Sequence, residues 1–201
     1  MKRYGPAKFE RRGVNVLPDV LAHNLDIVFC GTAAGTASAA QRAYYAGPGN
    51  AFWPTLFDVG LTPRALQPHE FSRCTEWKLG FTDLAKHASG GDGLLEKAHF
   101  DVPRLRRLIL DYRPRIVAFT SKRAGAEFLG RGVDYGLLSE TVGYSRLFVL
   151  PSPSGAARRY WNREHWRELA RLRSSLPVTL DATRSWRVVS RPRTCACSSA
   201  G

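Results

Sequence analysis

The apolar residues of this chain fall into short continuous runs that alternate with longer segments of helical character. The runs at 26–30, 115–120 and 144–150 predict short strands, buried on both faces of a mainly parallel sheet. Segments 51–59, 103–112, 121–128 and 162–172 predict helices from their apolar periodicity and their end signals. Because strands alternate with helices, we expect an α/β fold, a three-layer α/β/α sandwich with a short, mainly parallel central sheet.

The ends of the predicted helices carry specific signals. Asp101 is the expected N-cap of the 103–112 helix, which has Pro103 in its first turn. Asn50 and Ser121 are the expected caps of the helices that follow them. The inward faces of the first and last helices are expected to comprise Trp53, Leu56 and Phe57, and Trp166, Leu169 and Leu172.

These patterns divide the chain into three parts. Residues 1–24 are basic and are expected to form a loosely ordered arm, and residues 25–175 should form the folded domain. From residue 176 the periodicity decays, so residues 176–201 are expected to be a loosely ordered basic tail. Two loops, 31–50 and 151–155, follow predicted strands, and ligands of α/β sheets bind beyond the carboxyl ends of strands. The loops are therefore the expected site.

Charge adds information about the partner. The chain has 30 Lys and Arg against 17 Asp and Glu, a net charge of +13, which favours a polyanionic partner such as DNA. Membrane-surface binding is less favoured because no basic amphipathic helix stands out, and no apolar stretch reaches the ~20 residues of a membrane span. The basic start lacks the apolar core of a secretory signal, so we expect a cytoplasmic protein that acts as a monomer.

The four cysteines and five histidines show no metal-site spacing. Cys30 closes an apolar run and is interpreted as a core residue, whereas Cys195 and Cys197 lie in the tail. We expect no metal, no cofactor and no structural disulfide.

Four motifs resemble one family, and they occur in its order. Residues 28–35 (VFCGTAAG) and 50–53 (NAFW) are similar to the first strand, loop and following Asn-x-Phe-Trp of the mismatch-specific uracil/thymine-DNA glycosylase group. Residues 80–84 (GFTDL) and 149–155 (VLPSPSG) resemble its two later motifs. The resemblance covers about residues 25–172 and places the chain in the uracil-DNA glycosylase superfamily. It implies an enzyme that flips a damaged base out of DNA and hydrolyses its N-glycosidic bond.

The chain also departs from this group. The position of the family's water-holding Asn in the first motif is Ala33, and that of the Asn in the second motif is Ser152. Residues 44–53 (YYAGPGNAFW) are closer to a sister branch, the hypoxanthine-type glycosylases, in which this stretch supplies the working Asn. A divergent member is therefore expected, with its catalytic polar group elsewhere.

Asp83 and Asn50 are the candidate catalytic residues. The resemblance places Asp83 at the pocket wall, where a carboxylate can stabilise a sugar cation and orient water. Asn50 can hold the attacking water or bond the edge of the extruded base. Each has a structural alternative, since Thr82 and Asp83 could begin a helix and Asn50 could cap the 51–59 helix.

The remaining candidates would line the base pocket or contact DNA. Tyr45, with Tyr44, could stack on the flipped base, although both rings could instead pack in the core. The other pocket candidates are Gly31, Thr32, Ala33, Gly35 and Ser38. The candidates for phosphate contact, and for a wedge into the gap left by the base, are Ser152, Pro153, Ser154, Gly155, Arg158 and Arg159.

The sequence thus predicts a monofunctional glycosylase acting on uracil in duplex DNA, with single-stranded DNA as a further candidate substrate and hypoxanthine as the other candidate base. A catalytically weak or dead module that binds lesions or abasic sites is the alternative, supported by Ala33. A nucleotide-binding protein built on the 31–35 loop is disfavoured, because that loop lacks the lysine of a P-loop and the dinucleotide-binding glycine spacing.

Overall fold

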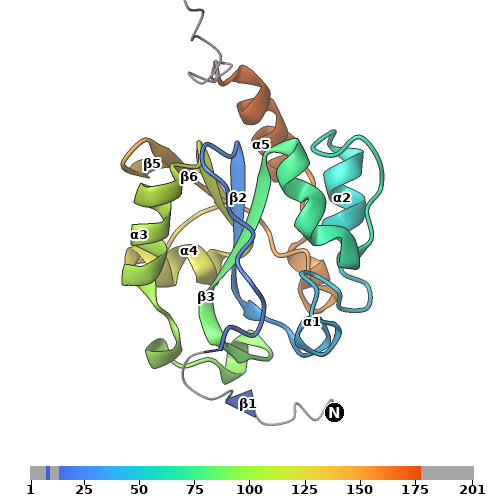
Figure 1. Cartoon of the computed structure of the whole chain (residues 1–201), viewed down its shortest axis with the longest axis vertical. Coiled ribbons are helices and arrows are strands. Elements are labelled where there is room, and N and C mark those ends of the chain that lie inside the picture. Colours follow the sequence, from blue (N-terminus) through green and yellow to red (C-terminus); the bar gives the residue numbers. More distant parts are fainter. Residues whose placement is uncertain (1–7, 10–13, 178–201) are drawn as a thin grey trace, which may run out of the picture.

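The computed structural model describes residues 8–9 and 14–177, and these form one mixed sheet with helices on both faces (Figure 1). The strand order is β1-β3-β2-β4-β6-β5. The central strands β3 (Leu79–Ser89), β2 (Ile27–Ala34), β4 (Ile116–Phe119) and β6 (Ser145–Val149) are parallel. At the edges, β1 (Lys8–Phe9) and β5 (Gly136–Val142) pair in the antiparallel sense.

The helices cover the two faces of this sheet. Helices α1 (Thr36–Gln41), α2 (Phe52–Asp58) and α5 (Glu164–Ser175) lie on one side, with the 3-10 helix η1 (Pro68–Trp77). On the other side lie α3 (Val102–Tyr112) and α4 (Lys122–Leu129). Short 3-10 helices η2 (Asp92–Leu94), η3 (Lys97–His99) and η4 (Gly155–Tyr160) lie in the connections. The predicted three-layer α/β/α fold is confirmed.

Alternating side chains of the buried strands build two cores. Phe29 packs edge-on against Phe52 of α2, with ring centroids 5.1 Å apart, and stacks at 6.1 Å from Trp166 of α5. Its neighbour Cys30 is fully buried in the opposite core, with Ile109 of α3. The continuous apolar run 27–30 follows from this arrangement, since both faces of β2 are covered.

Several helix predictions are confirmed and one is corrected. The Asp101 carboxylate accepts a hydrogen bond from the Arg104 N–H at 2.9 Å, and the Ser121 hydroxyl accepts one from Ala124 at 3.0 Å. In α2, however, Phe57 is 46% exposed, and Phe52 is buried in its place. In α5, Trp166 and Leu169 are buried, whereas Leu172 is only partly buried.

Three strands escaped the pattern analysis, and the first is the two-residue strand β1 in the segment expected to be a loose arm. The GFTDL segment does not begin a helix, because residues 79–89 form β3, where Thr82, Asp83 and Lys86 are buried. Buried polar residues break the apolar run that would have identified this strand. The edge strand β5 alternates exposed and less exposed positions over seven residues and so has no continuous apolar run.

The segment before β2 also differs from expectation. Residues 14–24 were expected in a loose arm, yet Val16, Leu17 and Val20 are buried in the core. Val20 and Phe81 exchange backbone hydrogen bonds of 2.9 Å, so this segment is held against β3. The packed domain therefore begins well before residue 25. The predicted tail lies outside the described residues from 178 onward.

Candidate active site

A pocket of about 1090 Å³ opens at the carboxyl ends of the parallel strands. It is formed where the loops after β2, β4 and β6 meet the middle of β3. This is the expected location for a site in such a sheet. Fourteen of the fifteen predicted site residues line it: Gly31, Thr32, Ala33, Gly35, Ser38, Tyr44, Tyr45, Asn50, Asp83, Ser152, Pro153, Ser154, Gly155 and Arg158.

Asp83 lies in the wall of this pocket, directly across from the first motif. In the parallel register of β2 and β3, Asp83 is paired with Gly31. A Cβ atom on Gly31 would lie 2.5 Å from Asp83 Oδ1, so the carboxylate occupies the space that the missing side chain leaves. Asp83 and Ala33 line the same pocket, and Asp83 brings to it a polar side chain that Ala33 lacks.

The Asp83 carboxylate is buried and incompletely satisfied. The residue is 3% exposed, and Oδ2 has no hydrogen-bond partner among the described residues. Burial raises the pKa of Asp83 from 3.8 to about 6, and nearby Lys86 and Arg104 oppose this rise whereas Asp19 adds to it. A carboxylate with a raised pKa and an unpartnered oxygen in a pocket is typical of a catalytic residue.

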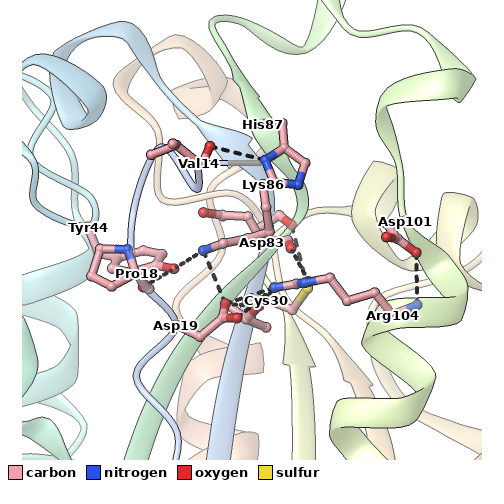
Figure 2. A network of polar contacts seen from close by, with 12 residues as sticks. Val14, Pro18, Asp19, Cys30, Tyr44, Asp83, Lys86, His87, Asp101 and Arg104 are labelled. Atoms are coloured by element: carbon pink, nitrogen blue, oxygen red, sulfur yellow. Dashed lines mark hydrogen bonds and ion pairs between the residues drawn. The ribbon is translucent and has the colours of Figure 1, made fainter. Parts of the chain in front are cut away.

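Beneath Asp83 lies a buried polar network (Figure 2). Asp19 accepts hydrogen bonds from Arg104 Nη2 at 2.7 and 2.9 Å and from the Thr82 hydroxyl at 2.7 Å, and it pairs with Lys86 Nζ at 3.1 Å. Lys86 also donates to the Tyr44 hydroxyl at 3.0 Å. The network shows why Thr82 and Lys86 are tolerated in the middle of β3, because each has a partner within it.

The two adjacent tyrosines have different environments. Tyr45 is partly buried, has a left-handed φ of 55°, and stacks its ring on Phe52 with centroids 3.7 Å apart. Its hydroxyl donates to Thr120 Oγ1 at 3.3 Å. Tyr44 is only 2% exposed and stacks on Phe81, so its ring belongs to the core. Of the pair, Tyr45 presents the aromatic surface to the pocket.

Asn50 lies just before Ala51, the N-cap residue of α2, and also lines the pocket. Its side-chain oxygen accepts a hydrogen bond from the Phe52 N–H at 2.9 Å. The adjacent Ala51 N–H donates to the Pro153 carbonyl at 2.8 Å, which joins the two predicted loops. The two loops also approach each other closely at Gly155, where an added Cβ would lie 3.2 Å from the Pro48 carbonyl oxygen. The hydrogen bond from Phe52 occupies the Asn50 carbonyl and leaves its NH2 group to donate to a ligand.

The two candidate arginines of η4 are placed differently. Arg158 lines the pocket, and its guanidinium lies where a Cβ on Gly49 would meet it at 2.8 Å. Gly49 has φ +68°, so both its conformation and this contact favour glycine. Arg159 does not line the pocket; its guanidinium lies 4.5 Å from the centroid of the exposed Tyr160 ring.

The small residues of the first loop shape the pocket floor and rim. Thr32 donates to the Asp92 carboxylate at 2.6 Å, and the Ser38 hydroxyl accepts from the Ala46 N–H at 3.1 Å. Ala33 is partly buried and brings no polar side-chain atom to the pocket. The Ser38 hydroxyl and the Thr32 hydroxyl are thus both engaged within the protein.

Sequence reasoning missed several pocket residues. Thr120 and Ser121 follow β4, Asp92 lies in a glycine-rich loop, and Tyr160 ends η4. The first two could have been found from the rule that predicted the other loops, since they follow a predicted strand. The stretch 89–93 (SGGDG) carried a turn signal but no recognised motif.

The described residues show no group of three His, Cys, Asp or Glu side chains that could hold a metal ion. Cys30 and Cys74 are buried free thiols, and Cys195 and Cys197 lie outside residues 8–9 and 14–177. In that same part of the chain, no helix has the length and apolar character to span a bilayer.

Comparison with known proteins agrees with this geometry. The fold is similar to the solution NMR structure of a protein from Methanosarcina acetivorans, proposed to be a uracil DNA glycosylase. The two have a TM-score of 0.52 and 22% sequence identity over 79% of this chain and 95% of that chain. The model of the uracil DNA glycosylase superfamily matches residues 18–172, which include β2, β3, β4, β6 and both motif loops. This chain belongs to the uracil DNA glycosylase superfamily.

Proposed function

We propose that this protein is a monofunctional DNA glycosylase that extrudes uracil from DNA and hydrolyses its N-glycosidic bond, leaving an abasic site. The observation that carries the proposal is the Asp83 carboxylate, which is buried in the pocket wall with one oxygen lacking a partner among the described residues. Superfamily membership supports the reaction class and DNA as the substrate.

Asp83 is the proposed catalytic residue because of what the reaction requires. Departure of the base leaves positive charge on the sugar, and a nearby carboxylate stabilises that charge. The same carboxylate can accept a proton from the water that attacks the sugar carbon. Both roles need the ionised form. In the mismatch-specific glycosylases an Asn at the position of Ala33 holds the attacking water. Here Asp83 would take that role, so catalysis does not require a polar side chain at position 33.

The other pocket residues have roles that follow from their free groups. The Tyr45 ring, stacked on Phe52, is the proposed platform for the extruded base. The Asn50 NH2 group is a donor and so suits a carbonyl oxygen of uracil. The backbone and hydroxyls of 152–155 lie on the pocket rim, where a DNA phosphate would pass.

The proposal excludes a lyase step for a physical reason. A Schiff-base nucleophile must be an accessible, uncharged amine. The lysine nearest to Asp83 in sequence is Lys86, whose side chain is 1% exposed and ion-paired with Asp19. Base release without strand cleavage is therefore the expected outcome.

The test is a single-turnover assay on an oligonucleotide that carries one uracil, followed by alkali cleavage of abasic sites. The wild-type protein should release uracil, and Asp83→Asn should slow release by about two orders of magnitude or more, with unchanged DNA affinity. Asp134→Asn, a surface carboxylate that is 96% exposed, is the control for loss of one negative charge. A wild-type rate in Asp83→Asn would remove this residue from the mechanism.

A second candidate is a lesion-binding module without catalysis, which the apolar Ala33 side chain favours. It predicts tight binding of uracil or abasic DNA by the wild-type protein with no base release. Parallel oligonucleotides that carry hypoxanthine or a thymine mismatch show whether uracil is the preferred base.

A further inference from the structure

An irregularity in β3 places a lysine beneath the pocket. Along the β2–β3 ladder, Ala33 pairs with Ala85, but the next residue, Ala34, pairs with Ser89. Three residues, 86–88, are thus extra in β3. Such bulges redirect side chains and are common beside active sites. Here the bulge turns Lys86 away from solvent, so that its side chain is 1% exposed.

The segment 14–20 covers this bulge. Val16 donates its N–H to the Lys86 carbonyl at 2.8 Å, and the His87 ring nitrogen lies 3.1 Å from the Val14 carbonyl oxygen. The same segment supplies Asp19, which lies 3.1 Å from Lys86 Nζ (Figure 2). Chain segments that are distant in sequence therefore cooperate to bury one ammonium group.

The charges of this cluster balance only if Asp83 is included. Asp19 is shared by two cations, Lys86 at 3.1 Å and Arg104 at 2.7 Å. One carboxylate cannot neutralise both. Asp83 is the second carboxylate of the cluster, and Arg104 Nη1 also donates to its backbone carbonyl at 3.3 Å. A buried excess of positive charge acts strongly on a neighbouring acid, because little water screens it.

We propose that Lys86 is a positioning residue that keeps the Asp83 carboxylate ionised in its buried site. This inference deepens the proposed function and rests on it. Lys86 does not line the pocket, so it acts on the reaction indirectly.

The other titratable groups around Asp83 do not supply this charge. Cys30 of β2, Tyr44 and Tyr45 all have pKa values raised by burial and by Asp83, so all three are neutral. Asp19, from the 14–20 segment, raises the pKa of Asp83. Lys86 of β3 and Arg104 of α3 lower it, and Lys86 has the larger effect.

The experiment removes the charge of Lys86 and follows the ionisation of Asp83 in two ways. Lys86→Met keeps an apolar stem of similar length, Lys86→Arg keeps the charge, and Lys97→Met removes an exposed charge as the control. The titration of Asp83 is measured by NMR of isotope-labelled aspartate carboxyl groups. Its signal is assigned by its absence from Asp83→Asn. Single-turnover uracil release is measured over the same pH range.

The wild type, Lys86→Arg and Lys97→Met should titrate Asp83 near pH 6. In Lys86→Met the midpoint should rise by about one pH unit or more. For a rise of one unit, uracil release should then fall by about twofold at pH 7 and by about tenfold well below pH 6, and it should return towards the wild-type rate at high pH. Lys86→Gln, which can still bond Asp19 and Tyr44, should behave in the same way and serves if the Met variant does not fold.

An unchanged Asp83 midpoint in folded Lys86→Met or Lys86→Gln would overturn the inference, even if activity fell equally at all pH values. A shifted midpoint with no shift in the pH dependence of uracil release has a different meaning. This result would show that Lys86 controls the ionisation of Asp83, but that Asp83 is not the carboxylate on which uracil release depends.

Discussion

Burial of Asp83 makes it a costly residue for the folded state. Its pKa is about 6 in the folded protein against 3.8 for the exposed group, so the folded state binds this proton more tightly than the unfolded state. The free energy of unfolding must therefore fall as pH rises from about 4 to about 6. A pKa difference of about two units between the folded and unfolded states lowers the free energy of unfolding at neutral pH by about 3 kcal/mol.

Asp83→Asn should remove this cost. We expect the variant to be more stable than the wild type by about 1–3 kcal/mol at pH 7.5, with a smaller difference at pH 4.5. Urea unfolding at the two pH values measures the difference. Equal or lower stability at pH 7.5 would show that the ionised carboxylate is well satisfied in the folded protein.

A substitution at Gly31 tests whether the position of the Asp83 carboxylate matters, because it leaves the carboxylate itself unchanged. Gly31→Ala would place a Cβ 2.5 Å from Asp83 Oδ1, so the carboxylate must move. We expect uracil release to fall by about tenfold or more while the protein stays folded, because small misplacements of a reacting group are costly. Gly132→Ala, outside the pocket and with nothing within 4 Å of the added Cβ, is the control. Similar rates in both variants would contradict the steric argument.

At the scale of the elements, η4 offers a direct comparison, because its two adjacent arginines point to different places. Arg158 lines the pocket, whereas Arg159 lies over Tyr160. If Arg158 fills the gap left by the extruded base, it opposes restacking, which is worth a few kcal/mol in a duplex. Arg158→Ala should therefore impair duplex substrates far more than single strands.

Arg159→Ala removes the same charge and is the natural control. It should weaken both substrates about equally, as expected for a phosphate contact. Single-turnover rates on single-stranded and duplex uracil DNA decide the matter. An equal loss on both substrates in Arg158→Ala would leave it as a phosphate contact only.

At the scale of the whole molecule, the net charge of +13 predicts how binding responds to salt. Arginines that neutralise phosphates release counterions, so affinity should fall steeply, with a log–log slope of about −0.9 per phosphate contacted in duplex DNA. Binding of Asp83→Asn to uracil duplex, measured by fluorescence anisotropy from about 50 to 200 mM salt, avoids turnover. A flat response would mean that the excess charge does not contact DNA.

Much of the architecture followed from local pattern. The predicted strands 26–30, 115–120 and 144–150 correspond to β2, β4 and β6, because strands covered on both faces need apolar side chains. Strand β2 continues to Ala34, into the segment that was predicted to be a loop. Asp101 and Ser121 capped the predicted helices, since a cap depends only on the residues within the first turn. Motif order likewise brought both predicted loops to one pocket.

Other features were decided only by the tertiary structure. Lys86 carries no local signal of burial, and its burial depends on a bulge in β3 and on the distant segment 14–20. Tyr44 and Tyr45 are neighbours of the same type and both line the pocket, yet only the fold buries the Tyr44 ring in the core and leaves Tyr45 partly exposed. The sequence by itself determined strands β2, β4 and β6, the caps and the motif loops, because these depend on nearby residues. The ionisation of Asp83 was left to the tertiary structure, because charge and burial act through space between distant segments.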